Sequence, residues 1–489
     1  MLVDALLSAH RRSPAALAVD DGIRALSYGQ LAHLARVLRD VISRQTSCER
    51  VGVMLPASAA FPATLFGILW ASRVAVPLNF LLRAEELTRI IQDAELDLIL
   101  TIGHFRDLAG QLPVRAVFLE ELSLKWKMTR SRFRPLGHAP TVESNATAVI
   151  LYTSGTTAEP KGVELTSGNL HSNCVDTIDS LEIDPRQSFL NVLPPFHVFG
   201  LTGNVLVPVF LAATVHAIPR FNPLHAIRLV AQKKLSVVLA IPSMYAAMLR
   251  SKSASADSFR SIYLAFSGGE PLPDSVREGF AKRFGVTVYQ GYGLTETSPV
   301  VSACSLHAHR EGTVGRPIRN VQIRIVGADG SAIPTGQDGE VLVRGPNVMK
   351  GYFRKPEETR AVIDADGWFH TGDIGRLEAD GFLSITGRLK EMLIVGGENV
   401  YPREIEAVLE MHEAVLQAAV IGAPDGLRGE VPIAFVLPRQ GETPTPDDLR
   451  AFARQRLASS KTPRRIEIRS DLPTGPTGKI LKRKLREML

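Results

Sequence analysis

The stretch Tyr152-Thr-Ser-Gly-Thr-Thr-Ala-Glu-Pro-Lys161-Gly162 follows the apolar run 146–152, which predicts a buried strand. A loop of glycine and small hydroxyl residues can turn tightly and direct backbone N–H groups and hydroxyls at phosphate oxygens. Lys161 adds a positive charge, but Pro160 precedes it and the GxxxxGK[ST] spacing of kinases and GTPases is absent. The stretch therefore predicts a phosphate-binding loop of another kind.

Helical patterns and short apolar runs alternate around this loop. Residues 31–42 and 85–93 have helical spacing, with Ser27 as the N-cap of the first helix. Strands are expected at 50–55, 96–102, 236–241 and 261–266. This alternation favours largely parallel sheets with helices on their faces, and such sheets bind ligands at the loops that follow their strands.

The most apolar stretch, residues 61–82, is interrupted by Arg73 and Pro77. It predicts a buried helix followed by a strand and not a membrane span. After Gly312 the pattern changes to the alternating runs 321–326 and 339–344, which predict a small antiparallel region. The turn signals of that region are Asp329-Gly330, Asp338-Gly339 and Asp380-Gly381.

From about Gly387 a mixed α/β segment runs to a basic tail. We therefore expect a large domain over residues 1–387, with a barrel-like part at about 312–387. A hinge over 388–390 and a small domain over 391–489 follow. A length of 489 residues agrees with two or three domains.

Hydrophobic residues make up 45% of the chain and charged residues 22%, which is typical of a soluble globular protein. The formal net charge of +6 suits anionic ligands such as nucleotides or CoA and is too small to indicate nucleic acid. The cysteines Cys48, Cys174 and Cys304 lie far apart and predict neither a disulfide framework nor a metal cluster. The N-terminus has no signal-peptide pattern, so we expect a cytoplasmic protein.

A basic run with interspersed apolar residues lies at 125–134. It predicts either a solvated loop between two elements, which we favour, or a contact with an anionic partner or a membrane surface. The run contains Lys125, Trp126, Lys127, Met128, Arg130, Arg132, Phe133 and Arg134.

The segment 152–162 resembles the TSGTTGxPKG signature of the adenylate-forming superfamily, with Ala158 in place of the second glycine. That superfamily includes acyl-CoA synthetases, aryl-CoA ligases, firefly-type luciferases and the adenylation domains of peptide synthetases. Further segments resemble its other motifs in the same order, and Ser27-Tyr28-Gly-Gln-Leu31 resembles its opening motif, so the resemblance covers essentially the whole chain. These segments are Gln290-Gly-Tyr-Gly-Leu-Thr-Glu296-Thr, His370-Thr-Gly-Asp373, Gly387-Arg388-Leu-Lys390-Glu, Gly396-Gly397-Glu398-Asn399-Val-Tyr-Pro402 and Pro473-Thr-Gly-Pro-Thr-Gly-Lys479.

The resemblance implies an α/β fold with two αβαβα-type sheets and a distorted antiparallel β-barrel in the large domain, and a small, mobile α+β C-terminal domain. It implies an ATP-dependent ligase that forms acyl-AMP and pyrophosphate, and then acyl-CoA and AMP. Between the two steps the small domain would rotate about Lys390, so that the loop 396–399 replaces the loop that carries Lys479.

Residue roles also follow from the resemblance. Glu296 would bind Mg²⁺, Asp373 would accept hydrogen bonds from the ribose hydroxyls, and Arg388 would approach the ribose or a phosphate. Tyr292 would stack on adenine, and Lys479 would stabilise charge that develops in the transition state. The implied catalytic residues are Lys479, Thr153, Lys161 and His197. The implied ATP-binding residues are Thr153, Ser154, Gly155, Thr156, Thr157, Lys161, Gly269, Glu270, Gln290, Gly291, Tyr292, Gly293, Thr295, Asp373, Ile385, Arg388 and Lys479.

The acid is less well defined than the reaction. Pro194-Pro-Phe-His197-Val-Phe-Gly200-Leu resembles the entrance of the acyl site. Residues 194–203 contain no acidic side chain, which argues against an amino acid, because a buried ammonium without a partner costs several kcal/mol. Apolar walls favour a medium- or long-chain fatty acid, followed by an aryl acid. The implied acyl-pocket residues are His197, Phe199, Ser267, Gly268, Gly269, Gly293 and Val300, and the implied thiol loop is Gly396, Gly397 and Glu398.

Two alternatives stay open. An acyl-AMP ligase could load the phosphopantetheine of an acyl carrier protein, although no extra insertion between Thr313 and Gly387 obstructs domain rotation, which favours CoA. A non-catalytic relative would lack Lys479, Glu296 or Lys161, and all three are present. The expected partners are the carboxylic acid, ATP, CoA and Mg²⁺, with no nucleic acid and at most weak peripheral membrane contact, for a monomer or a homodimer.

Overall fold

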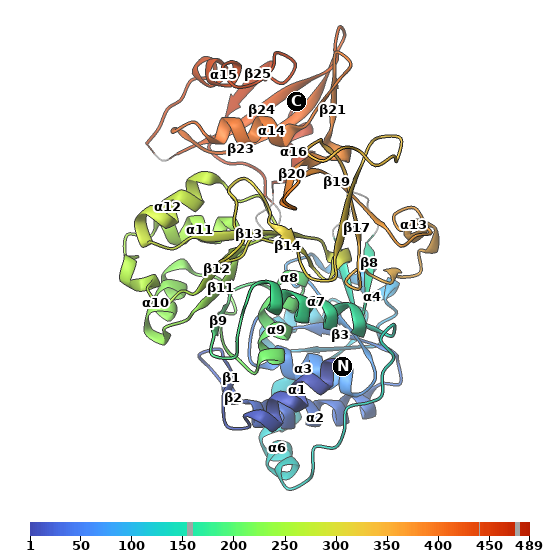
Figure 1. Ribbon diagram of the computed structural model, residues 1–489. Coiled ribbons are helices and arrows are strands. Elements are labelled where there is room, and N and C mark those ends of the chain that lie inside the picture. Colours follow the sequence, from blue (N-terminus) through green and yellow to red (C-terminus); the bar gives the residue numbers. More distant parts are fainter. Residues whose placement is uncertain (154–159, 440, 475–479) are drawn as a thin grey trace.

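Two large sheets form the centre of the protein (Figure 1). The computed structural model describes residues 1–153, 160–439, 441–474 and 480–489. The first sheet has nine strands in the order β15-β14-β13-β12-β11-β9-β10-β1-β2, and the second has seven in the order β18-β8-β7-β4-β3-β5-β6. The bounds of the first are β1 Leu17–Asp20, β2 Ala25–Ser27, β9 Ser188–Asn191, β10 Thr214–Ala217, β11 Val237–Ala240, β12 Leu264–Ser267, β13 Val288–Gly293, β14 Val300–Ala303 and β15 Arg316–Pro317; those of the second are β3 Arg50–Met54, β4 Val74–Pro77, β5 Leu98–Thr101, β6 Arg115–Phe118, β7 Thr147–Thr153, β8 Lys161–Thr166 and β18 Gly351–Tyr352.

Both sheets are parallel in their interior and antiparallel at one or both edges. The interior strands are short and apolar, and β4, β5, β11 and β12 are buried along their whole length because helices cover both faces. The helices are α1 Leu2–Arg12, α2 Tyr28–Gln45, α3 Ala60–Trp70, α4 Ala84–Asp93, α5 Arg106–Ala109, α6 Leu124–Arg132, α7 Ser167–Ser180, α8 Val198–Leu201, α9 Val207–Leu211, α10 Pro223–Lys233, α11 Pro242–Arg250 and α12 Asp274–Phe284.

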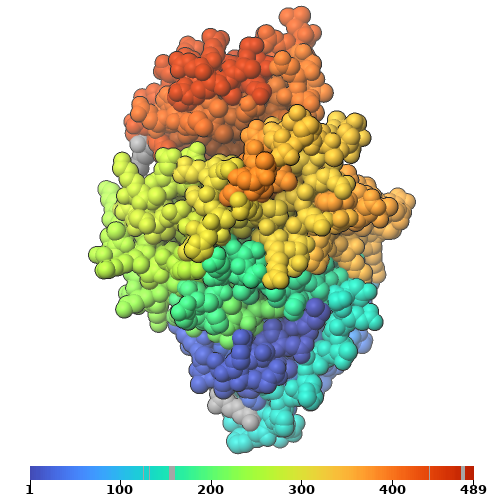
Figure 2. Space-filling view, viewed as in Figure 1, coloured from blue at the N-terminus to red at the C-terminus, as the bar shows by residue number. Residues whose placement is uncertain are grey.

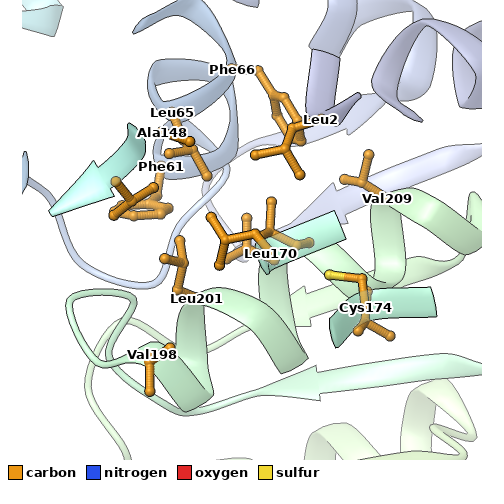
Figure 3. Close-up of a cluster of buried hydrophobic side chains, with 14 of the residues drawn as sticks. Leu2, Phe61, Leu65, Phe66, Ala148, Leu170, Cys174, Val198, Leu201 and Val209 are labelled. Atoms are coloured by element: carbon orange, nitrogen blue, oxygen red, sulfur yellow. The ribbon is translucent and has the colours of Figure 1, made fainter. Parts of the chain in front are cut away.

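The main hydrophobic core lies where the helices of the two sheets meet (Figure 3). Side chains of α1, α3, α7, α8 and α9 gather there, including Leu2, Phe66, Leu170 and Leu201. The helices α2 and α3 approach closely at Gly67, where a Cβ atom would come within 2.9 Å of Leu38 Cβ. The core therefore holds α8 firmly at the loop that carries His197.

A third, antiparallel sheet contains β16 Gln322–Val326, β17 Gly339–Arg344, β19 Phe369–Leu377 and β20 Leu383–Arg388. The C-terminal part, drawn in orange to red in Figure 1, lies at one end of the molecule. Its strands are β21 Leu393–Val395, β22 Glu398–Val400, β23 Val415–Asp425, β24 Gly429–Pro438 and β25 Arg465–Ile468, and its helices are α14 Pro402–Glu410, α15 Pro446–Arg454 and α16 Lys482–Arg486. The helix α13 Pro356–Arg360 lies between β18 and β19.

This architecture confirms the predicted α/β fold class, with large sheets followed by a smaller C-terminal part. The apolar stretch 61–82 forms α3 and β4, and Ser27 caps α2 by accepting a hydrogen bond from the Gln30 backbone at 3.2 Å. The hinge at 388–390 and the exact domain bounds stay predictions. Among the described residues, no helix has the length and apolar character needed to cross a bilayer.

One expectation about local structure was wrong. The basic run that we favoured as a loop forms the helix α6. Leu124 and Met128, four residues apart, pack against the main core from one face of this helix. The charged residues conceal that short apolar stripe, so charge density alone misled the prediction.

Replacing Tyr28 by Phe tests the contact between the start of α2 and the segment that leads into β10 of the nine-stranded sheet. The buried Tyr28 hydroxyl donates to the carbonyl oxygens of Pro208 and Ala213, at 3.0 and 2.7 Å. Its loss should lower the free energy of unfolding by about 2 kcal/mol, because it leaves two buried acceptors short of a donor. Urea unfolding would measure the change. Tyr263→Phe is the control, since its hydroxyl makes one surface hydrogen bond, and equal midpoints for the two variants would contradict this account.

Candidate active site

A buried carboxylate lies at the junction of the nine-stranded and antiparallel sheets. Asp373 and Arg388 are register partners on β19 and β20, and Arg388 Nε lies 2.8 Å from Asp373 Oδ1. The Tyr292 hydroxyl, from the end of β13, donates to Asp373 Oδ2 at 2.6 Å. Burial and then the Asp373 charge raise the pKa of Tyr292 far above its usual range, so its hydroxyl remains a donor. Two residues assigned to ATP, Tyr292 and Arg388, thus contact the carboxylate of a third, Asp373.

Lys161 and Glu296 are connected through a tyrosine that the motifs did not indicate. The Lys161 ammonium lies over the Tyr352 ring, 5.3 Å from its centroid, and the Tyr352 hydroxyl donates to Glu296 Oε1 at 2.9 Å. Burial, then Glu296, raises the pKa of Tyr352, which keeps this hydroxyl protonated. Tyr352 lies on the edge strand β18 and therefore positions both the lysine and the carboxylate.

Lys161 also forms an ion pair with Glu358 of α13, and Lys355 lies 3.3 Å from the same carboxylate. The hydrogen bond from Lys161 is the main reason why the pKa of Glu358 is lowered. Sequence reasoning missed Tyr352 and Glu358, because both lie about 190 residues beyond Lys161 and their contacts depend on how the chain folds. Their sequence neighbourhood carried no separate signal.

The strand ends around the phosphate-loop segment are paired. Thr153, the last residue of β7, is the register partner of Lys161 at the start of β8, so the segment between them joins antiparallel strands. Gly162 permits close packing there, since a Cβ atom would come within 2.8 Å of Ile150. The predicted residues Ser154, Gly155, Thr156, Thr157 and Lys479 lie outside the described residues.

The remaining nucleotide candidates lie at neighbouring strand ends. Gly269 and Glu270 follow β12, and Gln290, Gly291 and Gly293 belong to the adjacent β13. A side chain on Gly291 would meet the Phe266 ring at 2.3 Å, and one on Gly293 would meet the Pro299 carbonyl at 2.1 Å. Thr295 and Glu296 belong to the short 3-10 helix Thr295–Thr297 that follows, and Ile385 of β20 pairs with Gly375 of β19.

Glu296 is the candidate Mg²⁺ ligand, and its surroundings fit that ion. Among the described residues, no group of three or more His, Cys, Asp or Glu side chains converges to hold a metal. Mg²⁺ commonly takes one or two carboxylates and completes its shell with phosphates and water. A single carboxylate held by Tyr352, on the side of the site where Lys161 lies, suits this mode of binding.

His197 lies at the start of α8, with its ring 4.7 Å from that of Phe196. Burial lowers the pKa of His197 to about 4, so the imidazole is neutral at physiological pH. Its Nε2 atom is buried and has no hydrogen-bond partner among the described residues. A neutral, unpaired ring suits a position beside an acyl group or the wall of its pocket.

Of the predicted acyl-pocket residues, Phe199 and Val300 line a narrow apolar cavity of about 20 Å³, whereas His197, Ser267, Gly268, Gly269 and Gly293 do not belong to its lining. The Phe199 ring lies between two glycines, 3.5 Å from a Cβ position on Gly268 and 3.6 Å from one on Gly203. Thr177, whose buried hydroxyl has no partner among the described residues, belongs to the lining, and the motifs did not indicate it. The lining residues are Thr177, Leu181, Ile183, Phe199, Thr202, Gly203, Val207, Leu239, Phe266, Pro299 and Val300.

The expected thiol loop is a hairpin turn. Gly396 and Gly397 have φ values of +60° and +86° and join β21 to β22 across the pair Val395 and Glu398. Positive φ at both positions of a two-residue turn favours glycine. Lys390 lies in the 3-10 helix Leu389–Glu391 directly after β20. The motif therefore places a preformed turn close in sequence to the expected hinge.

Comparison with known proteins defines the class. The AMP-binding enzyme model matches residues 7–353, and the model of the AMP-binding enzyme C-terminal domain matches residues 404–479. A feruloyl-CoA synthase from an Amycolatopsis species is 37% identical over 97% of this chain and 96% of its own. A long-chain-fatty-acid–CoA ligase from Bacillus subtilis is 33% identical over 90% of this chain and 85% of its own length. The structure of the anthranilate CoA ligase AuaEII with anthranoyl-AMP superposes with a TM-score of 0.91 at 26% identity. The superposition covers 100% of this chain and 96% of that chain.

The chain therefore belongs to the AMP-binding enzyme family, the adenylate-forming superfamily that its motifs resemble. Within it, the protein is an acid–thiol ligase that works through an acyl-adenylate, with ATP and CoA as substrates.

Tyr352→Phe separates the two contacts of Tyr352, because it removes the hydrogen bond to Glu296 and keeps the ring under Lys161. We expect the Mg²⁺ concentration for half-maximal pyrophosphate release to rise about fivefold, since a carboxylate without its donor is less well oriented. The KM for ATP at saturating Mg²⁺ should change less. An unchanged Mg²⁺ titration would contradict the role of Glu296.

His197→Asn tests the neutral imidazole through acid stability. The pKa of His197 is lowered from 6.5 to about 4, so its contribution to stability is present above pH 6.5 and is lost as the pH falls from 6.5 towards 4. The melting temperature should therefore fall less between pH 7 and about 4.5 in this variant than in the wild type. His225→Asn is the control, because His225 is exposed, and should follow the wild type. Parallel curves for all three proteins would refute the assignment.

Proposed function

We propose that this ligase activates a compact aryl or arylalkenoic acid with a polar ring substituent, and transfers the acyl group to CoA. The observation that carries the proposal is the narrow apolar cavity beside Phe199. Its lining has no charged residue, and a volume of about 20 Å³ holds about one water molecule. A long alkyl chain would have to displace Phe199, Leu239 or Phe266, whereas a short planar acid requires a smaller rearrangement.

The aromatic and hydroxyl groups of the lining favour the same class of acid. Phe199 and Phe266 lie with their ring centroids 6.4 Å apart in an edge-to-face arrangement, which suits another ring. The Thr177 hydroxyl is buried without a partner, and a buried polar group of this kind is stabilised by a substrate hydroxyl or ether. The names of the feruloyl-CoA synthase and the anthranilate CoA ligase agree with this class. We therefore place an aryl acid ahead of the medium- or long-chain fatty acid that the sequence favours.

In the first step, a carboxylate oxygen attacks the α-phosphorus of ATP and the bond to the bridging oxygen of pyrophosphate breaks. Both reactants are anions, so the site must offset their repulsion and align them. We assign this work to Lys161, Lys479 and the hydroxyls of the phosphate loop. Asp373 and Tyr292 would hold the ribose and adenine. Mg²⁺, bound at Glu296, would offset further phosphate charge.

In the second step, the CoA sulfur attacks the acyl carbonyl carbon and AMP leaves. We propose that a turn of the C-terminal part about Lys390 removes Lys479 and brings the Gly396-Gly397 turn to the site. The turn already has its positive φ values, so it needs no reordering on arrival.

The test is kcat/KM for hydroxylated cinnamic, unsubstituted cinnamic, octanoic and palmitic acids, from pyrophosphate release with CoA. Hydroxylated cinnamic acid should react best. Thr177→Val should lower its kcat/KM about tenfold, the value of one hydrogen bond, and leave unsubstituted cinnamic acid within about twofold. If palmitic acid had the highest kcat/KM, the proposal would be wrong and a long-chain fatty acid would be the substrate.

A further inference from the structure

The helix α6 and the turn after it, residues 133–137, form the end of the molecule that lies opposite the C-terminal part (Figures 1 and 2). We call this end the tip. Two aromatic side chains stand out from this tip. Trp126 is 60% exposed and Phe133 is 85% exposed, although aromatic residues of this size are usually covered. The reaction chemistry described above uses none of these residues.

The tip is also strongly basic. Residues 124–142 contain five Lys and Arg residues and no Asp or Glu. The Arg130 guanidinium lies over the Trp126 ring at 4.6 Å from its centroid, so charge and aromatic surface are adjacent. Beside them, Arg11 and Arg134 line an open groove of about 320 Å³ together with His10 and His33, and none of its lining residues is acidic.

This surface is held in place by α2. Arg36, 8% exposed, donates to the carbonyl oxygens of Arg134 and Pro135 at 3.1 and 2.5 Å. His33 Nδ1 lies 3.1 Å from the Ser131 hydroxyl. Because buried contacts fix the backbone of the turn, the exposed aromatic and basic side chains are presented together and are not merely parts of a loose loop.

We propose that the tip formed by α6 and residues 133–137 docks the enzyme on an anionic lipid surface. Trp126 and Phe133 would enter the interface, where amphipathic rings are favoured, and Arg11, Arg130 and Arg134 would contact headgroup phosphates. Each basic residue near such a surface contributes roughly a fivefold gain in binding. The groove between Arg11 and Arg134 gives one headgroup phosphate a place between two guanidinium groups.

The position of the tip favours a membrane over an acidic carrier protein. A carrier protein must deliver its thiol to the strand ends near the C-terminal part, and the tip lies at the other end of the molecule (Figure 1). A membrane surface has no such requirement. The docking goes beyond the proposed function and can be measured without any acid.

Tryptophan fluorescence tests the proposal directly. The chain has three tryptophans, and Trp70 and Trp368 are only 3% and 4% exposed, so Trp126 alone should respond to a surface. Vesicles of phosphatidylcholine with phosphatidylglycerol, at low salt and without ATP or acid, should shift its emission to the blue and co-sediment the full chain. Pure phosphatidylcholine vesicles should do neither.

Variants separate the contributions of the basic residues and of Trp126 to vesicle binding. Arg130→Ala with Arg134→Ala should weaken vesicle binding about 30-fold. Trp126→Phe should abolish the spectral shift and retain most co-sedimentation. Arg250→Ala with Lys252→Ala, which removes two charges elsewhere, should bind as the wild type does, and every variant should keep its turnover of soluble acids.

Two results would overturn the proposal. One is the absence of any shift or co-sedimentation with anionic vesicles. The other is a Trp126 shift on addition of a purified acidic carrier protein, with none on vesicles. Loss of turnover in the panel of acids with intact vesicle binding would instead count against the proposed function alone.

Discussion

The buried carboxylate of Asp373 is the interaction on which the arrangement of this enzyme depends. Almost no water reaches it, so protein groups must stabilise its charge, and the two that contact it, the Arg388 guanidinium and the neutral Tyr292 hydroxyl, come from different sheets. Tyr292 belongs to the nine-stranded sheet, and Arg388 belongs to β20, the last strand before the C-terminal part. One charge thereby aligns the strand ends that we propose for the nucleotide with the segment about which we propose that the small domain turns.

Much of the fold could be predicted from local patterns, because each such pattern reports burial that is periodic along the chain. The broken apolar stretch that forms α3 and β4 is of this kind, and Ser27, a residue type that caps helices, marks the start of α2. The helix α6 was missed because only two of its apolar residues, Leu124 and Met128, face the core and the rest of its sequence is dominated by charge. The edge strand β18 is two residues long, too short to produce any period.

The candidate site likewise contains residues that the sequence motifs indicate and residues that they do not. Motifs predicted nucleotide or metal roles for Asp373, Arg388, Tyr292 and Glu296, because these residues sit in short segments whose sequence is itself distinctive. They could not locate Tyr352, Glu358 or Thr177, since these residues matter through contacts with segments far along the chain. The size of the cavity beside Phe199 likewise depends on the rotamer of Phe199 and on the backbone at Gly203 and Gly268, which no residue pattern records.

The ion pair between Lys161 and Glu358 has a consequence for how the free enzyme meets its nucleotide. The lysine that we propose for phosphate already pairs with a carboxylate, which has the same sign of charge as the proposed ligand. Nucleotide binding at that lysine would then be an exchange of one anion for another, and its net gain would be the difference between two similar attractions. Such a placeholder keeps the empty site electrically balanced and lets the products depart without leaving an isolated cation behind.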